Sequence, residues 1–189
     1  MKKTFTLILL LLSTATVWSQ HLTFKGIELN GSVKAFSAQL QKKGYEYIGT
    51  TNGIAMLSGA FANFQNCTIG LLGNEAGTIV KAAVIFPNES TWGKLEDTYL
   101  TIKSLLIQKY GEPTITLEEF KNNYSTELDD YMKLSQIEND EILYGCAWEL
   151  PNGTIELRLD GDISGYYPVL SYIDADNRQQ SIEQALEDL

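Results

Sequence analysis

The sequence predicts an α+β protein in which two tandem helix-plus-antiparallel-sheet units form one curved sheet with helices packed on one face. Helical periodicities that end at a glycine alternate with groups of short strand-like segments, in the order helix, strands, helix, strands. The stretch LIQKYGEPTI at 106–115 also echoes QLQKKGYEYI at 39–48, so both halves contain the same kind of helix ending. We expect the units to span about 24–87 and 88–175, followed by a short C-terminal helix.

Residues 1–19 have the pattern of a secretory signal peptide. Two lysines near the start precede an unbroken apolar run at 7–12, and the small or moderate residues Val17 and Ser19, at the −3 and −1 positions, fit a cleavage site before Gln20. The apolar run is too short to span a bilayer. We therefore expect a periplasmic or secreted bacterial protein of residues 20–189, a single domain with no membrane insertion.

The first unit opens with a short extended segment at 22–31 and continues into a helix. Ser32 fits the N-cap position, and apolar residues then recur at helical spacing. Gly44 follows the last turn, where a positive φ would end the helix. Four meandering strands are expected next, at 45–50, 54–64, 67–72 and 78–86.

The second unit opens with the best-defined helix of the chain. Its apolar residues step by three and four and form one stripe: Trp92, Leu95, Tyr99, Ile102 and Leu106. Gly111 should end this helix with a positive φ, and Pro113 cannot continue it. Thr116 and Glu119 fit a capping box, so one or two further helices are predicted over 117–136. Three strands and a helix should complete the chain, at 144–150, 154–159, 167–174 and 181–189.

The charge balance makes some partners improbable. Removing Lys2 and Lys3 from the 14 basic residues leaves 12 against 24 acidic residues. Such a chain repels phosphate backbones, which argues against nucleic acid as a partner, and it is disfavoured at anionic membrane surfaces for the same reason.

Two cysteines remain after processing, Cys67 and Cys146, and each lies in an alternating stretch with its side chain on the apolar face. An exported protein can form disulfides, so one interpretation is a bond that joins the two units. The other interpretation is two buried free thiols, which pack as small apolar groups. Two cysteines alone are too few for a structural zinc site.

The phrases FKGIELNGSVKAFSAQLQKKGY and TYLTIKSLLIQKYGEP resemble small exported bacterial proteins of unknown function with the fold of the β-lactamase inhibitor proteins. The resemblance covers nearly all of 24–175 and consists of element order, glycine stops and aromatic placement. It implies a concave sheet with helices behind it. No inhibitory residue of that family can be placed on this chain, so the resemblance does not imply inhibition of a β-lactamase. A cystatin-like α+β roll is the alternative fold.

Catalytic signatures are missing from the sequence. His21 is the only histidine, and it would lie beside the new N-terminus, where we expect no rigid catalytic shell. No motif for a hydrolase nucleophile, a zinc protease, a P-loop or a dinucleotide site occurs. Asp160, Asp162 and Ser164 imitate half of a calcium loop, but position 12 is Ser171, so we interpret them as a hairpin loop. We expect no metal and no cofactor.

The remaining feature is a group of tyrosines near predicted strands. Tyr45, Tyr47, Tyr166, Tyr167 and Tyr172 could form a row on an open sheet face and bind a protein or a glycan. Ordinary sheet packing is the alternative. The sequence thus favours a non-enzymatic, exported binding module with an unknown protein or glycan partner. The rival hypothesis is a carboxylate-dependent enzyme that acts on envelope glycans.

Overall fold

The computed structural model describes residues 21–121, 128–139 and 141–187, so the predicted signal peptide and its cleavage site lie outside the described residues. The strands of the first half are β1 (Thr23–Phe24), β2 (Ile27–Glu28), β3 (Glu46–Thr51), β4 (Ile54–Phe61), β5 (Phe64–Gly73) and β6 (Ile79–Ile85). Those of the second half are β7 (Ile115–Leu117), β8 (Gly145–Leu150), β9 (Gly153–Asp162) and β10 (Gly165–Asp174). The helices are α1 (Val33–Lys42), α2 (Trp92–Tyr110), α3 (Asp130–Glu138) and α4 (Ala175–Glu187).

The two halves of the chain form one antiparallel sheet in the order β3-β4-β5-β6-β10-β9-β8-β7. Each half is a meander that runs from an outer edge to the centre, where the last strand of one half pairs with the last strand of the other. Val84 on β6 lies opposite Leu170 on β10 at this junction. The arrangement confirms the predicted α+β fold, with helices on one side of a large antiparallel sheet, in place of the cystatin-like roll.

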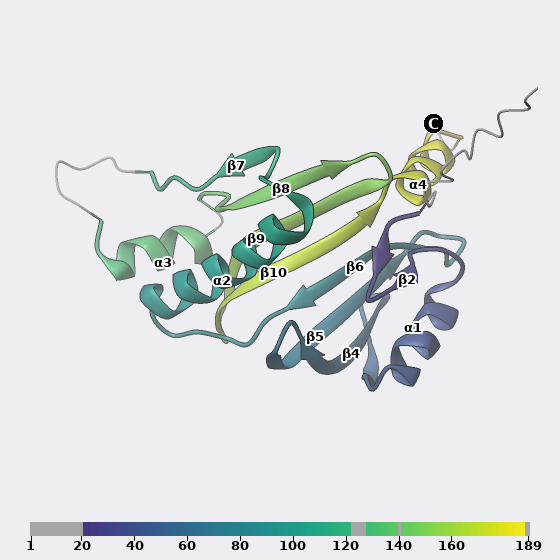
Figure 1. Ribbon diagram of the computed structural model, residues 1–189, viewed down its shortest axis with the longest axis horizontal. Coiled ribbons are helices and arrows are strands. Elements are labelled where there is room, and N and C mark those ends of the chain that lie inside the picture. Colours follow the sequence, from purple (N-terminus) through teal and green to yellow (C-terminus); the bar gives the residue numbers. More distant parts are fainter. Residues whose placement is uncertain (1–20, 122–127, 140, 188–189) are drawn as a thin grey trace, which may run out of the picture.

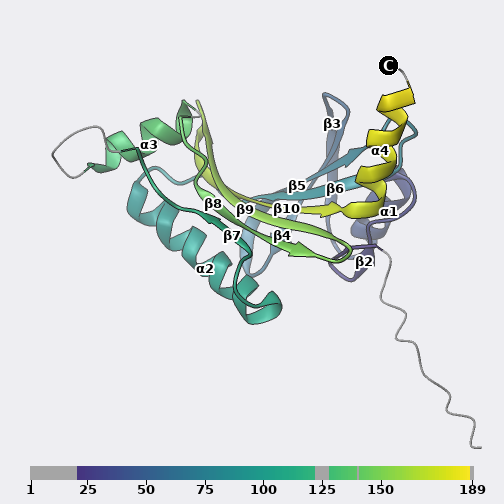
Figure 2. The ribbon, with the colours of Figure 1, turned by 90° about the horizontal axis from the view of Figure 1, so that it is seen from above.

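The sheet is strongly curved, and its two faces differ. Figure 2 shows α2 outside the curve, while the concave side is left uncovered. Helix α1 lies on the same side as α2, in front of the sheet in Figure 1, and α4 stands at one end of the sheet. The short β1–β2 hairpin fills the space between α1 and the end of β10.

The hydrophobic core lies between the helices and the convex face of the sheet. Strand register aligns one row of core side chains across six strands: Leu57, Ile69, Val84, Leu170, Leu157 and Cys146. Every member of this row is at most 5% exposed. The apolar stripe of α2 packs against it, and Phe36 and Leu40 of α1 complete the core over the other half.

The cap that starts α1 and the glycines that end α1 and α2 act as the sequence predicts. Ser32 caps α1, because its Oγ accepts a hydrogen bond from the amide of Ala35 at 3.2 Å. Gly44 and Gly111 have φ values of 95° and 84°, which confirms that both helices end in the left-handed region that favours glycine.

The predicted helix over 117–136 is wrong for its first part. Ile115–Leu117 is instead the edge strand β7, which pairs with β8, and α3 begins only after Asp129, whose carboxylate accepts from the Met132 amide at 2.8 Å. The Thr114 amide donates to the Ala147 carbonyl at 2.8 Å and starts this pairing. Contacts with a distant strand thus override the local capping-box pattern.

Two further boundaries differ from the prediction. The strand expected over 54–64 is broken at Ala62 and Asn63, which turn back with φ values of 48° and 70°. The C-terminal helix starts six residues before Ser181, because Asp174 caps it: the Asp174 Oδ1 atom accepts from the Asn177 amide at 3.0 Å.

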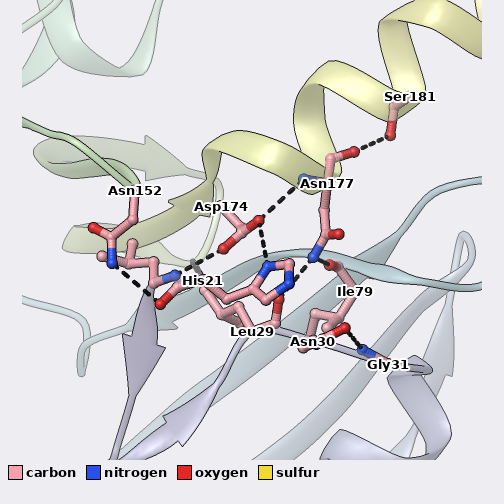
Figure 3. Close-up of polar contacts among 10 residues, drawn as sticks. His21, Leu29, Asn30, Gly31, Ile79, Asn152, Asp174, Asn177 and Ser181 are labelled. Atoms are coloured by element: carbon pink, nitrogen blue, oxygen red, sulfur yellow. Dashed lines mark hydrogen bonds and ion pairs between the residues drawn. The ribbon is translucent and has the colours of Figure 1, made fainter. Parts of the chain in front are cut away.

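His21 is held rigidly, contrary to the flexible terminus that the sequence suggests. Its Nδ1 atom lies 3.1 Å from Oδ1 of the fully buried Asp174, and the Leu22 amide donates to Asp174 Oδ2 at 2.8 Å. Asn152 donates from Nδ2 to the His21 carbonyl at 3.1 Å. Figure 3 shows these contacts converging where the first described residues meet the start of α4. Asp174 therefore connects the first described residues to the start of α4.

Candidate functional site

The concave face of the sheet is not covered by helices, and we call it the open face. Because side chains alternate along a strand, residues opposite the core row point away from the helices. Register gives two continuous rows across seven strands. One consists of Ser58, Thr68, Ile85, Val169, Arg158, Gly145 and Leu117. The other consists of Met56, Gly70, Ala83, Ser171, Glu156, Ala147 and Ile115.

The centre of the open face is lined by small residues. Gly70, Ala83, Ser171 and Ala147 belong to one row, and Gly145 lies in the next. A Cβ atom added to Gly145 would lie 2.5 Å from the Leu157 carbonyl oxygen, so only glycine fits there. Ala83 and Ala147 are partly exposed, whereas Gly70, Ser171 and Gly145 are buried. Of these small residues, the two alanines are therefore the ones that a bound molecule can reach.

Apolar side chains are exposed at the β7 end of the open face. Ile115, Leu117 and Leu143 are 45%, 49% and 56% exposed. With Gly145, Ala147 and the neighbouring part of β9 they surround a depression of about 270 Å³. Exposed apolar side chains gathered around a depression are typical of an interaction surface rather than of solvent-facing sheet.

Charged groups occupy the middle of the same face. Glu156 and Arg158 lie close enough to Lys81 to influence its pKa. Burial lowers the pKa of Lys81, the nearby Glu156 carboxylate opposes this effect, and Arg158 reinforces it. Arg158 in turn pairs with Asp160, with Nη2 2.5 Å from Oδ2. The open face therefore presents both signs of charge beside its apolar end.

The five predicted tyrosines do not form one row, which corrects the expected platform. Tyr45 and Tyr172 are core residues, 6% and 5% exposed, and Tyr45 donates from Oη to the Ala60 carbonyl at 3.0 Å. Tyr47 lies on the helix side of β3, with Oη 2.7 Å from Thr50 Oγ1. Tyr166 also lies on the helix side and donates to Glu138 Oε2 at 3.0 Å. Tyr167 alone among the five is on the open face.

The two cysteines are free thiols, so the disulfide interpretation is wrong and the buried-thiol interpretation holds. Cys67 is on β5 and Cys146 on β8, with three strands between them. At a strand spacing of about 4.8 Å, their backbones are on the order of 19 Å apart, against roughly 7 Å at most for a disulfide. Burial raises the pKa of both thiols, which makes them poor nucleophiles.

Sequence reasoning missed a polar cluster behind β7 and β8. The Tyr99 hydroxyl, fully buried on α2, donates to Glu118 Oε1 at 2.5 Å and lies 3.3 Å from Cys146 Sγ. Lys103 Nζ lies 2.6 Å from the same Glu118 oxygen. The cluster attaches the segment after β7 to α2. The one sequence signal for this cluster is the spacing of Tyr99 and Lys103, which puts them on the same face of α2. Their partner Glu118 is 15 or more residues away, so no local pattern indicates it.

One carboxylate at the edge of the open face, that of Asp162, is favoured in its charged form by hydrogen bonds. Asp162 accepts from the Ser164 hydroxyl at 2.5 Å, from the Ser164 amide at 2.7 Å and from the Tyr167 hydroxyl at 3.0 Å. These hydrogen bonds, led by that of the Ser164 side chain, lower the pKa of Asp162. A glycosidase needs one carboxyl that stays protonated as an acid, which is the opposite tendency.

Within residues 21–121, 128–139 and 141–187, no group of three or more His, Cys, Asp or Glu side chains could hold a metal ion. No helix of this described part is long and apolar enough to cross a membrane. Comparison of the chain with protein-family models, curated proteins and solved structures finds no match. The resemblance to the β-lactamase inhibitor fold therefore stays a prediction.

Proposed function

We propose that this chain is an exported binding module that engages another protein through its open face. The observation that carries the proposal is that a continuous eight-stranded sheet has one uncovered face with exposed apolar side chains at its β7 end. A sheet normally buries at least one apolar face, and here the helices and the core do so on the other side. The open face is thus free for a partner.

The size of the open face suits a protein partner. Seven strand spacings of about 4.8 Å give a width of roughly 34 Å. The ten-residue strands β9 and β10 are each about 33 Å long. The area is therefore on the order of 1,000 Å², close to the roughly 800 Å² that each partner contributes to a stable interface.

The chemistry of the open face favours a protein over a glycan. Sugars stack on flat aromatic rings, and of the five tyrosines considered only Tyr167 is on this face. Ile115, Leu117 and Leu143 offer aliphatic contacts instead, and Lys81 with Glu156 offers charges of both signs. This combination of an apolar area beside a mixed-charge area is typical of protein–protein interfaces.

We test the proposal with the mature chain, residues 20–189, as bait in the secreted or periplasmic fraction of the cells that produce it. The native chain should retain a specific protein. The double variant Ala83→Arg, Ala147→Arg fills the small-residue row and should lose that protein. The matched variant Leu100→Arg, Leu105→Arg changes exposed residues on the outer side of α2 and should retain it.

Thermal melts of both variants separate lost binding from lost folding. Retention of the protein by a folded Ala83→Arg, Ala147→Arg variant, or its loss with the α2 variant alone, would contradict the proposal. Export through residues 1–19 is part of the same proposal. N-terminal sequencing of the secreted form should give Gln20, whereas a soluble periplasmic form that retains Met1 would contradict it.

A further inference from the structure

A second surface, on the helix side of the sheet, has the features of a peptide site. Helix α1 and strand β3 bound an open groove of about 670 Å³. Val33 and Ala38 of α1 form one wall, Tyr47 and Thr50 of β3 form the other, and Ala55 of β4 forms part of the floor. The groove is lined mostly by apolar atoms, and it lies away from the open face.

The wall formed by β3 is also the edge of the sheet, since β3 ends the strand order. Asn52 and Gly53, with φ values of 50° and 79°, form a two-residue turn that makes Thr51 and Ile54 the closing pair of the hairpin. The amide and carbonyl of the next residue, Thr50, then point away from β4. An extended segment lying along the outer edge of β3 would hydrogen-bond these backbone groups, and its side chains on the helix side would lie at the mouth of the groove.

A bulge in β3 limits how much of the edge can be extended. The register with β4 shifts between Tyr47 and Gly49, which interrupts the regular ladder. Bulges of this kind protect an edge from open-ended association with other sheets. The edge therefore suits a short segment, whose side chains in the groove must supply the rest of the affinity.

Charge distinguishes the groove from the rest of the molecule. Lys34 lines it, and no acidic side chain is among the described residues that do. The stretch 33–43 contains Lys34, Lys42 and Lys43 and no acidic residue, in a chain with 24 acidic and 14 basic residues. A lysine-bearing groove on an acidic protein favours a ligand that carries a carboxylate.

We propose that the groove between α1 and β3 binds an extended peptide that adds a short strand to the β3 edge. Its apolar side chains on the helix side lie beside Tyr47 and Thr50 and face Val33 and Ala38 across the groove, and an acidic side chain lies near Lys34. This mode of recognition takes affinity from main-chain hydrogen bonds and specificity from side-chain pockets. The site is independent of the open face and would hold whether or not the open face binds a protein.

The test is an NMR titration of the mature chain, residues 20–189, labelled with nitrogen-15. The probes are blocked octapeptides that alternate valine and threonine, with one glutamate placed at each threonine position in turn. At least one should bind at about 1 mM or below. The largest amide shifts should lie in Tyr47–Thr51 and Val33–Gln41.

Three variants locate the site. Lys34→Glu reverses the charge in the groove, and Ala38→Trp fills it from an exposed position on α1. Each should weaken binding by about tenfold or more. Lys42→Glu makes the same charge change on the same helix outside the groove lining, and it should leave the affinity unchanged within about twofold. Unchanged melting temperatures show that the variants are folded.

A change in the peptide tests strand addition itself. N-methylation of the best octapeptide at alternate residues removes the amides that would face β3 and should abolish binding. If the methylated and unmethylated peptides bound equally well, the proposal would be overturned, because binding would then depend on side-chain contacts and not on pairing with β3. Shifts confined to the open face, or no binding by any of the peptides at about 1 mM, would overturn it as well.

Discussion

Asn177 is a buried polar residue whose side chain the structure predicts to be important for stability. It is 2% exposed in the first turn of α4. Its Nδ2 atom donates to the Leu29 carbonyl at 2.7 Å and to the Ile79 carbonyl at 2.9 Å, as Figure 3 shows. One amide thus connects α4 to the segment after β2 and to the first residue of β6.

The substitution Asn177→Ala removes both hydrogen bonds from two buried carbonyl oxygens. A buried polar group left without its hydrogen bond costs about 1–3 kcal/mol. Some relaxation and entry of water will reduce the sum, so we expect a loss of about 2–4 kcal/mol in the free energy of unfolding. For a chain of this size that corresponds to a fall of roughly 4–16 °C in melting temperature.

Urea unfolding followed by circular dichroism measures this difference directly. The control is Asn139→Ala at the end of α3, where an exposed asparagine donates from Nδ2 to the Ser135 carbonyl at 2.8 Å. That change should cost less than about 1 kcal/mol, because water replaces the lost hydrogen bond. Equal losses for the two variants, or a loss below about 1 kcal/mol for Asn177→Ala, would refute the docking of α4 described above.

Three further predictions concern stability. Reducing agent should leave the melting temperature unchanged, and Cys67 and Cys146 should both react with a maleimide in denatured, unreduced protein; a reduction-sensitive melt would contradict the free thiols. Gly145→Ala should destabilise by about 1–3 kcal/mol because its Cβ meets strand β9, whereas Gly93→Ala on α2, with nothing within 4 Å, should not; similar urea midpoints would contradict this. Burial, then Glu118 and Glu96, raise the pKa of Tyr144 from 10.0 to about 12, so its contribution to stability is complete below pH 10 and is lost as pH rises towards 12. Between pH 10 and 12 the urea midpoint of Tyr144→Phe should therefore fall less than that of the native protein. An equal fall in the two proteins would contradict the raised pKa of Tyr144.

The parts of the fold that were predictable are those where several local signals agree. Helix α1 has an N-cap at its start, a glycine stop at its end and an apolar periodicity between them, and these three signals agree on one helix. Strand β7 has none of these. Its three residues Ile115, Thr116 and Leu117 are a strand because β8 lies beside them, and a capping-box pattern there pointed to a helix.

The candidate site was less predictable, because sequence alternation says which residues share a face but not which face the helices cover. Tyr166 and Tyr167 are adjacent on β10 and necessarily point to opposite sides. Only the pairing of β10 with β6 and the packing of α2 decide that Tyr167 is on the open face. The contacts of His21 with Asp174 span more than 150 residues, so no local pattern could indicate them.

Site-specific photo-crosslinking in cells that produce the protein is the most direct test of the central claim, that the open face is the binding surface. Leu117 on the open face and Leu100 on the outer side of α2 are each 49% exposed, so a photoreactive phenylalanine at either position is equally accessible. The account predicts a discrete crosslinked protein from position 117 and none from position 100. A crosslinked product from position 100 alone, or equal yields from both positions, would contradict it.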